Sequence, residues 1–314
     1  MTLDLIITAR EDLTDRITLF TLAGATGSLP TYIPGSHLEF DLGKAGKRAY
    51  SLVDLVPLAP EPATYQIAVQ REDGGEGGSK AMHDLTEGDT VAATAPKNDF
   101  ALVPTDAPSL LLAGGIGVTP ILSFATSLKS RDLPYKFHFT TRSAEITPFK
   151  DHLSRDHGPQ FHLWHDNGNA IDLRDVIENT DRAAHIYCCG PKGMIDTVRE
   201  IAESAGFAAD HIHFELFTSA ASAEGDEAFE VEIASTGEVY TIPADKTIIE
   251  ALEDAGVDVM YDCQRGDCGI CQVDVLEGTP DHRDVVLSED ERASGDVMQI
   301  CVSRAKSARL KLDI

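Results

Sequence analysis

The sequence predicts three domains: an antiparallel β-barrel, a doubly wound α/β domain and a small C-terminal domain of mixed strands and helices. Short runs of alternating apolar and polar residues fill the first hundred positions, and a continuous apolar run at 109–113 then opens a region of strands and helices. A stretch of small and polar residues at 218–226 has the composition of a flexible linker. A length of 314 residues is enough for three cores. The predicted boundaries are 1–104 for the barrel, 105–220 for the α/β domain, 221–228 for the linker and 229–314 for the last domain.

The barrel is predicted from strand-like alternation between turn residues. Arg16–Leu22 and Tyr65–Gln70 each alternate apolar with polar side chains, and glycines and prolines separate such runs. This pattern is typical of antiparallel strands with one buried face, which a closed barrel provides.

The α/β domain is predicted from a change of pattern at Ser109–Ala113. Continuous apolar character there indicates a buried parallel strand, and Ile121–Leu128 has the apolar spacing of a helix. Strands and helices then alternate, which favours a doubly wound parallel sheet. Further strands are expected at 135–140, 161–165 and 185–189, and helices near 148–155, 172–178 and 191–205.

The C-terminal domain is predicted to begin with a hairpin, followed by a helix and a cysteine-rich loop. Phe229–Ile233 and Glu238–Ile242 are expected to pair, and a helix at 247–255 is capped by Thr247 or Asp245.

The cysteines carry the strongest chemical signal in the sequence. Cys263, Cys268 and Cys271, followed at a distance by Cys301, have the C-x4-C-x2-C…C spacing with which a plant-type ferredoxin holds a [2Fe-2S] cluster. A loop around a cluster also needs glycines where the backbone turns sharply and points N–H groups at sulfur, and Gly266 and Gly269 supply them. The chain is therefore predicted to transfer single electrons.

Two other interpretations of these cysteines are weaker. Structural zinc is usually held by pairs of closely spaced ligands, often with histidine, whereas here three thiols lie within nine residues and the fourth is distant. Four buried cysteines without a metal would not explain why three of them share one glycine-bearing loop. The histidines are scattered without metal-ligand spacing, which favours structural or solvated roles for His37, His138, His162, His165, His213 and His282.

The charge of the chain excludes some classes of partner. A formal net charge of −26 would repel nucleic acid and anionic membrane. Residues 226–314 contain 21 acidic and 8 basic residues, so the cluster-bearing end is strongly acidic. Such a surface could steer the cluster towards a basic patch on an acceptor, and general solubility explains it equally well. Without an export signal, a long apolar run or a disulfide pattern, the chain is expected to be soluble and cytoplasmic. A monomer is also expected.

A cluster that takes one electron cannot accept hydride, so a chain that draws on a nicotinamide needs a flavin. Arg48-Ala49-Tyr50-Ser51 is a candidate flavin site, because arginine pairs with phosphate, tyrosine stacks on a ring and the serine hydroxyl can reach the ring nitrogen. Gly74–Lys80 opens a short helix, and free N–H groups at a helix start bind phosphate. A glycine-rich hairpin loop without any ligand would have the same sequence.

Two glycine-bearing turns at strand ends indicate a nicotinamide site. Gly114–Pro120 lies between a buried strand and a helix, where a pyrophosphate binds, although it departs from the G-x-G-x-x-G fingerprint. Tyr187–Lys192 is the second turn, with Cys188 expected in the core and Cys189 at the crevice.

These motifs, in this order, resemble the phthalate dioxygenase reductase and vanillate O-demethylase reductase group of the ferredoxin reductase superfamily. The resemblance extends over nearly the whole length and includes His213–Phe217, Asp281–Asp284 and Cys301–Ser307. It implies a flavin domain, a nicotinamide domain and a C-terminal ferredoxin domain of β-grasp type.

The resemblance also implies roles for individual residues. Ser51, Cys189 and Glu215 would be the residues at the reacting rings. Cluster ligands would be the four cysteines named above. The remaining cofactor contacts would be Arg48, Ala49, Tyr50, Ser51, Gly78, Ser79 and Lys80 for the flavin, Gly115, Thr119 and Cys189 for the nicotinamide, and Phe217 beside the flavin ring.

The cofactors expected from this group are FMN, NADH and the [2Fe-2S] cluster. No segment after Ser79 obviously builds an adenine pocket, which favours FMN over FAD. Arg142 could favour a 2′-phosphate, but no second basic residue accompanies it in 143–148, and the group generally uses NADH.

The predicted function is that of an NADH-dependent reductase that passes electrons through FMN and the cluster to a separate terminal oxygenase. A Rieske-type oxygenase that hydroxylates or demethylates a small aromatic or methylated compound is the expected acceptor, with a cytochrome P450 as the alternative. A redox-sensing module without turnover is a different class of function. Retention of contact residues such as Ser51 and Thr119 argues against it.

Overall fold

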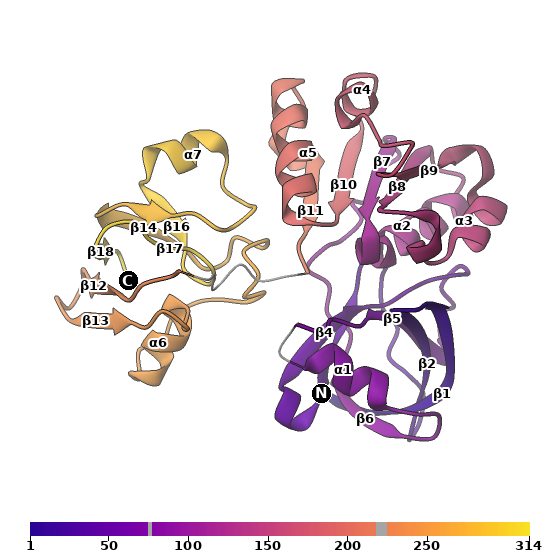
Figure 1. Cartoon of the computed structure of the whole chain (residues 1–314), viewed down its shortest axis with the longest axis horizontal. Helices are drawn as coiled ribbons and strands as arrows, with labels where there is room; N and C mark the ends of the chain where they lie inside the picture. Colours follow the sequence, from indigo (N-terminus) through magenta and orange to yellow (C-terminus); the bar gives the residue numbers. More distant parts are fainter. Residues whose placement is uncertain (75–76, 218–224) are drawn as a thin grey trace. The chain divides into compact units, whose positions relative to one another are not determined.

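Residues 1–74, 77–217 and 225–314 are described by the computed structural model, and they divide into two compact units, Met1–Glu215 and Leu216–Ile314. Both units are shown in Figure 1. Residues 75 and 76 of the predicted phosphate loop and 221–224 of the predicted linker lie outside the described residues. The first two predicted domains belong to the same compact unit. Their division at residue 104 stays a prediction.

The first unit begins with an antiparallel barrel. Its strands are ordered β4-β3-β6-β1-β2-β5, and a bridge between Leu52 and Ile67 joins the two outer strands, so the sheet closes on itself. Alternate side chains point inward and form a core that includes Phe20, Leu38 and Phe40. The elements are β1 (Thr2–Thr14), β2 (Ile17–Gly24), β3 (His37–Asp41), β4 (Lys47–Ser51), β5 (Thr64–Gln70), α1 (Gly78–Asp84) and β6 (Thr90–Thr94).

The second half of the first unit is a five-stranded parallel sheet. Its order β11-β10-β7-β8-β9 reverses direction between β7 and β10, which makes it doubly wound with a switch point between those two strands. The fold class predicted from the sequence is confirmed. The elements are β7 (Ser109–Gly114), α2 (Val118–Ser130), β8 (Tyr135–Thr141), α3 (Lys150–His157), β9 (Phe161–His165), α4 (Leu173–Glu178), β10 (His185–Cys189), α5 (Lys192–Ser204) and β11 (Ile212–Glu215).

The barrel and the parallel sheet are held together by a shared core and buried hydrogen bonds. One apolar cluster contains Val53 of the barrel segment and Phe124 of α2. The Ser123 hydroxyl donates to the Leu52 carbonyl over 3.0 Å and accepts from the Asp54 N–H over 2.9 Å. Because the core runs through the junction, the two halves form one unit, which the separate patterns of the sequence do not reveal.

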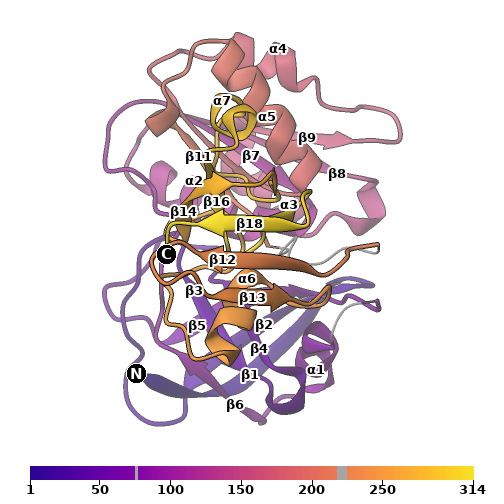
Figure 2. The same cartoon turned by 90° about the vertical axis from the view of Figure 1, so that its left-hand side faces the viewer.

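The second unit is a small mixed sheet with short helices. The strand order is β13-β12-β18-β14-β16, and β12 pairs antiparallel with β13 and parallel with β18. Figure 2 shows β18 running beside β12. The elements are β12 (Phe229–Ile233), β13 (Val239–Ile242), α6 (Ile248–Asp254), β14 (Gln272–Glu277), β15 (Pro280–Asp281), α7 (Glu289–Ser294), β16 (Val297–Gln299), β17 (Arg304–Ala305) and β18 (Arg309–Leu312).

The predicted hairpin and helix at the start of this unit are confirmed. Thr247, rather than Asp245, caps α6: its hydroxyl accepts from the Glu250 N–H over 3.1 Å, and the Glu250 carboxylate accepts from the Thr247 N–H over 2.8 Å. Within the described residues, no helix is both long and apolar enough to span a membrane.

Three histidines of the first unit are packed in ways that the sequence did not indicate. His138 stacks on Trp164 with ring centres 5.9 Å apart and accepts a hydrogen bond from its indole N–H. His157 forms a hydrogen bond with the Tyr135 hydroxyl.

His213 lies in a cluster of side chains at the edge of the sheet. Its ring stacks on Tyr187 with centres 4.6 Å apart, and its neighbours are His185, His211 and Asp210. Burial lowers the pKa of His138, His157 and His213 to about 4 in each case.

We expect these histidines to make the first unit acid-sensitive. Their folded pKa of about 4 lies below the unfolded value of about 6.5, so the unfolded chain binds more protons between these limits. The stabilisation is complete above about pH 6.5 and is lost as pH falls towards 4, by about 2 kcal/mol for each histidine at pH 5 and about 3 kcal/mol at pH 4. Fluorescence of Trp164, the single tryptophan, measures unfolding of this unit. Between about pH 7.5 and pH 5, the unfolding temperature of His138→Gln should fall by less than that of the wild type. An equal fall would contradict the lowered pKa of His138.

Candidate functional site

The cluster loop has the backbone shape that the sequence predicted. Gly266 and Gly269 have φ of 81° and 78°, and Gln264 between them and Cys263 has φ of 53°. Left-handed backbone carries a steric cost for residues with a Cβ, so glycine is favoured at the turns of Gly266 and Gly269. At Gly266 a Cβ would also lie 2.6 Å from a methyl group of Val302, so the loop packs closely on the rest of the unit.

The four predicted ligand cysteines are brought together. The Cys263 thiol lies within hydrogen-bonding reach of the thiols of Cys268 and Cys301, and Cys271 lies within reach of Cys301. The Arg265 N–H donates to the Cys263 sulfur over 3.3 Å, and the Ile270 N–H donates to Cys268. These contacts lower the pKa of Cys263, mainly through Cys268, and raise that of Cys301, mainly through Cys263. Convergent thiols with N–H groups aimed at sulfur fit a cluster held by four cysteines.

Among the residues that the structure describes, no group of three or more His, Cys, Asp or Glu side chains is arranged to hold a single metal ion. The thiols alone do not distinguish zinc from a cluster, because thiolates bind both.

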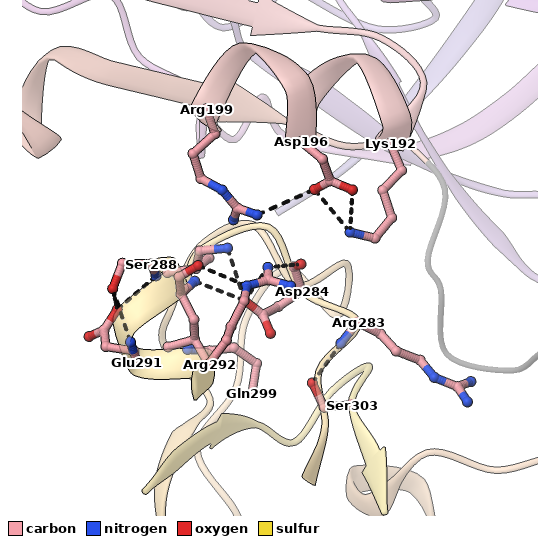
Figure 3. A network of polar contacts seen from close by, with 12 residues as sticks. Lys192, Asp196, Arg199, Arg283, Asp284, Ser288, Glu291, Arg292, Gln299 and Ser303 are labelled. Carbon is pink, nitrogen blue, oxygen red and sulfur yellow. Dashed lines mark hydrogen bonds and ion pairs between the residues drawn. The ribbon is translucent and has the colours of Figure 1, made fainter. Parts of the chain in front are cut away.

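A buried carboxylate supports the cluster loop from the adjacent segment. Asp284 is fully buried and accepts from the N–H groups of Val286 and Leu287 over 3.0 and 2.8 Å. Arg292 reaches both its carboxylate and its backbone carbonyl, as Figure 3 shows for the side chains. The Val285 N–H donates to the Gly266 carbonyl over 2.9 Å, so this segment is tied to the cluster loop. In the sequence Asp284 stands out only as part of a family motif, because its role depends on contacts that no local pattern shows.

The predicted flavin residues lie on β4 and α1. Ser51 is buried at the end of β4, Ala49 is exposed, and Tyr50 is half-buried against Phe40, with ring centres 5.8 Å apart. Burial raises the pKa of Tyr50 to about 12, so the phenol stays neutral.

Arg48 and the start of α1 are in direct contact. A Cβ on Gly78 would lie 2.4 Å from Cγ of Arg48 and 2.6 Å from its Nε, so only glycine allows the arginine to lie there. The Ser79 hydroxyl accepts from the Glu72 N–H over 2.9 Å, and Lys80 donates to the Asp73 carbonyl over 2.6 Å. Two cationic side chains and a hydroxyl thus gather around one turn, a donor set that fits a phosphate group.

The predicted nicotinamide residues gather at the switch point of the parallel sheet. A Cβ on Gly114 would lie 2.7 Å from Cδ of Pro191, and one on Gly117 would lie 2.3 Å from the carbonyl oxygen of Cys189. The turns after β7 and β10 therefore touch backbone to backbone. Ligands bind at the carboxyl ends of strands beside such a point.

The other predicted residues of this region also lie at strand ends. Gly115 has φ of 56°, and a Cβ there would meet nothing within 4 Å, so it faces open space. Thr119 is buried in the first turn of α2, and its hydroxyl donates to the Ile116 carbonyl over 3.1 Å. Cys189 and Glu215 are both buried and pair with each other as the last residues of β10 and β11.

The two remaining predicted residues, Cys188 and Phe217, lie in different units. Cys188 is fully buried, and burial raises its pKa, which fits the predicted role as an apolar core residue. Phe217 is 36% exposed and belongs to the second unit, whereas Ser51 and Glu215 belong to the first. Its place beside a flavin stays a prediction.

Comparison with known proteins identifies the family. Residues 231–306 match the family model for the 2Fe-2S iron-sulfur cluster binding domain. The chain is 37% identical to phthalate dioxygenase reductase of Burkholderia cepacia over 98% of this chain and 96% of that protein. It is 35% identical to the carnitine monooxygenase reductase subunit of Escherichia coli (strain K12), over 97% and 96%.

Solved structures give the same result over the full length. A structure of phthalate dioxygenase reductase, described as modular for electron transfer from pyridine nucleotides to [2Fe-2S], covers 100% of this chain and 98% of that one, with a TM-score of 0.74 and 36% identity. An intact type IV self-sufficient cytochrome P450 monooxygenase contains the same fold: 100% of this chain matches 41% of that one, with a TM-score of 0.72 and 34% identity.

The chain belongs to the family of reductase components of oxygenase systems that includes phthalate dioxygenase reductase and vanillate O-demethylase oxidoreductase. It is an oxidoreductase of the electron-transfer type, and residues 231–306 form its 2Fe-2S cluster binding domain. The resemblance, the activity class and the iron–sulfur cluster predicted from the sequence are thereby confirmed. The roles of individual site residues stay predictions.

Proposed function

We propose that this protein delivers electrons from NADH to a separate Rieske-type oxygenase that acts on a small aromatic or methylated compound. The observation that carries the proposal is the presence, in one chain, of a strand-order switch point that holds the predicted nicotinamide residues and of a loop of convergent thiols. The relatives support the acceptor, because their names assign them to phthalate dioxygenase and carnitine monooxygenase.

The first unit would hold the two organic cofactors. Arg48, Ser79 and Lys80 would bind the flavin phosphate, Tyr50 would lie against the ring, and the Ser51 hydroxyl would be aimed at the ring nitrogen. Gly115 and Thr119 would line the nicotinamide at the switch point, with Cys189 and Glu215 at the strand ends. The flavin, when bound, converts the two electrons of a hydride into two single electrons. The protein's own contribution is alignment of the two rings and exclusion of water, without an acid–base residue.

The second unit would hold the cluster and meet the acceptor. Cys263, Cys268, Cys271 and Cys301 are the proposed ligands, and the excess of carboxylates in this unit favours an acceptor with a basic patch. Glu289, Asp290 and Glu291 form the first turn of α7 and add to this negative surface.

A cytochrome P450 is the second candidate acceptor, because the self-sufficient P450 monooxygenase contains a segment of the same fold and similar sequence as this entire chain. We expect the purified chain to distinguish between these acceptors in reconstituted turnover: coupled product formation with a Rieske oxygenase and not with a P450 supports the first proposal.

The central experiment is an anaerobic visible spectrum recorded before and after addition of NADH. We expect flavin bands over broad iron–sulfur absorption, with both bleached by NADH and much more slowly by NADPH, since the segment after Arg142 lacks a second cation for a 2′-phosphate. A protein that stays colourless after loading with iron, sulfide and FMN would contradict the proposal. If NADH bleached the flavin bands but not the iron–sulfur absorption, the proposal would hold only for the first unit.

A further inference from the structure

The chain is bound to the second unit immediately before residues 218–224. The Leu216 N–H donates to Oδ2 of Asp267 over 3.0 Å. Asp267 lies between Gly266 and Cys268 in the cluster loop, its side chain is only 4% exposed, and it also accepts from Nε of Arg265 over 3.3 Å. The residue that follows β11 is therefore fixed directly to the loop that carries three of the four cysteines.

The chain is bound to the same unit again immediately after this segment. Both oxygens of Asp226 accept from Arg283, over 2.8 and 2.6 Å, and Arg304 lies 3.6 Å away. A carboxylate held by two nitrogens of one arginine is fixed in both distance and direction. Arg304 is itself held, because it donates to the carbonyls of Pro243 and Lys246 and lies over the Phe229 ring at 5.0 Å.

Both flanks lead to the cluster loop. Arg283 precedes Asp284, and the segment that these residues begin is hydrogen-bonded to Gly266 through Val285. Figure 3 shows Arg283 beside Asp284 and Arg292 in this segment. The described residues on both sides of 218–224 therefore belong to the second unit, and the chain passes from the first unit to the second at the Glu215–Leu216 peptide.

We infer that Asp267 is a positioning residue for electron transfer, because it fixes the point at which the first unit is joined to the cluster loop. A stretch that looks like a flexible linker in the sequence would then not act as the tether between the units. The length of residues 217–225 should have no influence on electron transfer from flavin to cluster while the Leu216–Asp267 bond is intact. This inference rests on the proposed function of the two units.

The test is an insertion of about twenty Gly and Ser residues after Ala221, in the wild type and in Asp267→Ala. Flavin bleaching by NADH and the later reduction of the cluster are followed anaerobically in one stopped-flow trace. In the wild type we expect the insertion to leave the rate of cluster reduction unchanged. In Asp267→Ala, where the segment becomes the tether, we expect the same insertion to slow that step about fivefold, because effective concentration falls as the −3/2 power of tether length.

Three further variants separate positioning from damage to the cluster loop. Leu216→Pro removes the N–H donor without touching the loop, and it should make transfer sensitive to the insertion in the same way. Asp267→Asn keeps a carbonyl acceptor and should restore insensitivity. Asp226→Asn also removes one negative charge, but at the other flank, and cluster reduction in this variant should stay insensitive to the insertion. Iron content and the electron paramagnetic resonance spectrum of the reduced cluster should match the wild type in each variant that is compared.

Small-angle X-ray scattering gives a readout that does not depend on turnover. The insertion should increase the radius of gyration in Asp267→Ala and Leu216→Pro by more than it does in the wild type. If the insertion slows cluster reduction in the wild type, or leaves it unchanged in both Asp267→Ala and Leu216→Pro, the inference is wrong. Failure of the proposed function is distinguishable, because NADH would then not reduce the cluster even in the wild type.

Discussion

Cys301→Ser is expected to abolish delivery of single electrons while leaving reduction of the flavin by NADH intact. Cys301 is 1% exposed, follows β16, and is in contact with the thiols of Cys263 and Cys271. A serine hydroxyl is a far poorer iron ligand than a thiolate, so the iron content should fall. Reduction of cytochrome c should fall about a hundredfold or more, since the cluster carries that step. Reduction of ferricyanide should persist, because a bound flavin can serve it directly.

Cys188→Ala is the matched control for this variant. Cys188 is as deeply buried as Cys301, yet it lies in β10 of the first unit and is not a proposed ligand. We expect this variant to keep the full iron content and the cytochrome c activity. If Cys301→Ser retained wild-type iron and its broad visible absorption, Cys301 would have to be removed from the ligand set.

Gly117→Ala is expected to slow the reduction of the flavin by NADH strongly. The added Cβ would lie 2.3 Å from the carbonyl oxygen of Cys189, 2.5 Å from its carbonyl carbon and 2.9 Å from the Gly190 nitrogen. These are backbone atoms, so the turns after β7 and β10 must separate. A shift of about 1 Å at a site that aligns two rings costs about a hundredfold in rate. Overpacking should also lower stability by about 1–3 kcal/mol.

The measurement is the anaerobic rate of flavin reduction over a range of NADH concentrations, together with the unfolding temperature. Gly193→Ala is the control, because Gly193 lies in the first turn of α5 at the same edge of the sheet and a Cβ there meets nothing within 4 Å. It should leave both quantities near their wild-type values. The flavin spectrum should be unchanged in both variants, since the barrel is not touched. An unaltered rate in Gly117→Ala would show that the contact between the two turns is not needed for NADH.

Local patterns in the sequence were sufficient for most of the elements and for the chemistry of the cluster. Alternation predicted β2 and β5, the apolar run at 109–113 predicted β7, and the spacing of Cys263, Cys268 and Cys271 predicted a loop whose glycines are left-handed. These features depend on neighbours a few residues apart, because side-chain period and backbone sterics act over that range.

The fold class, the order of the functional parts and the ligand type of the cluster thus follow from the amino-acid pattern alone. Contacts between distant segments became visible in the folded chain: Arg48 on Gly78, Gly117 against Cys189, and Leu216 on Asp267. The tertiary structure also showed that both flanks of the apparent linker belong to the second unit. Such contacts are selected by packing of the complete chain, since a hydrogen bond between residues 51 positions apart leaves no periodic trace in either segment.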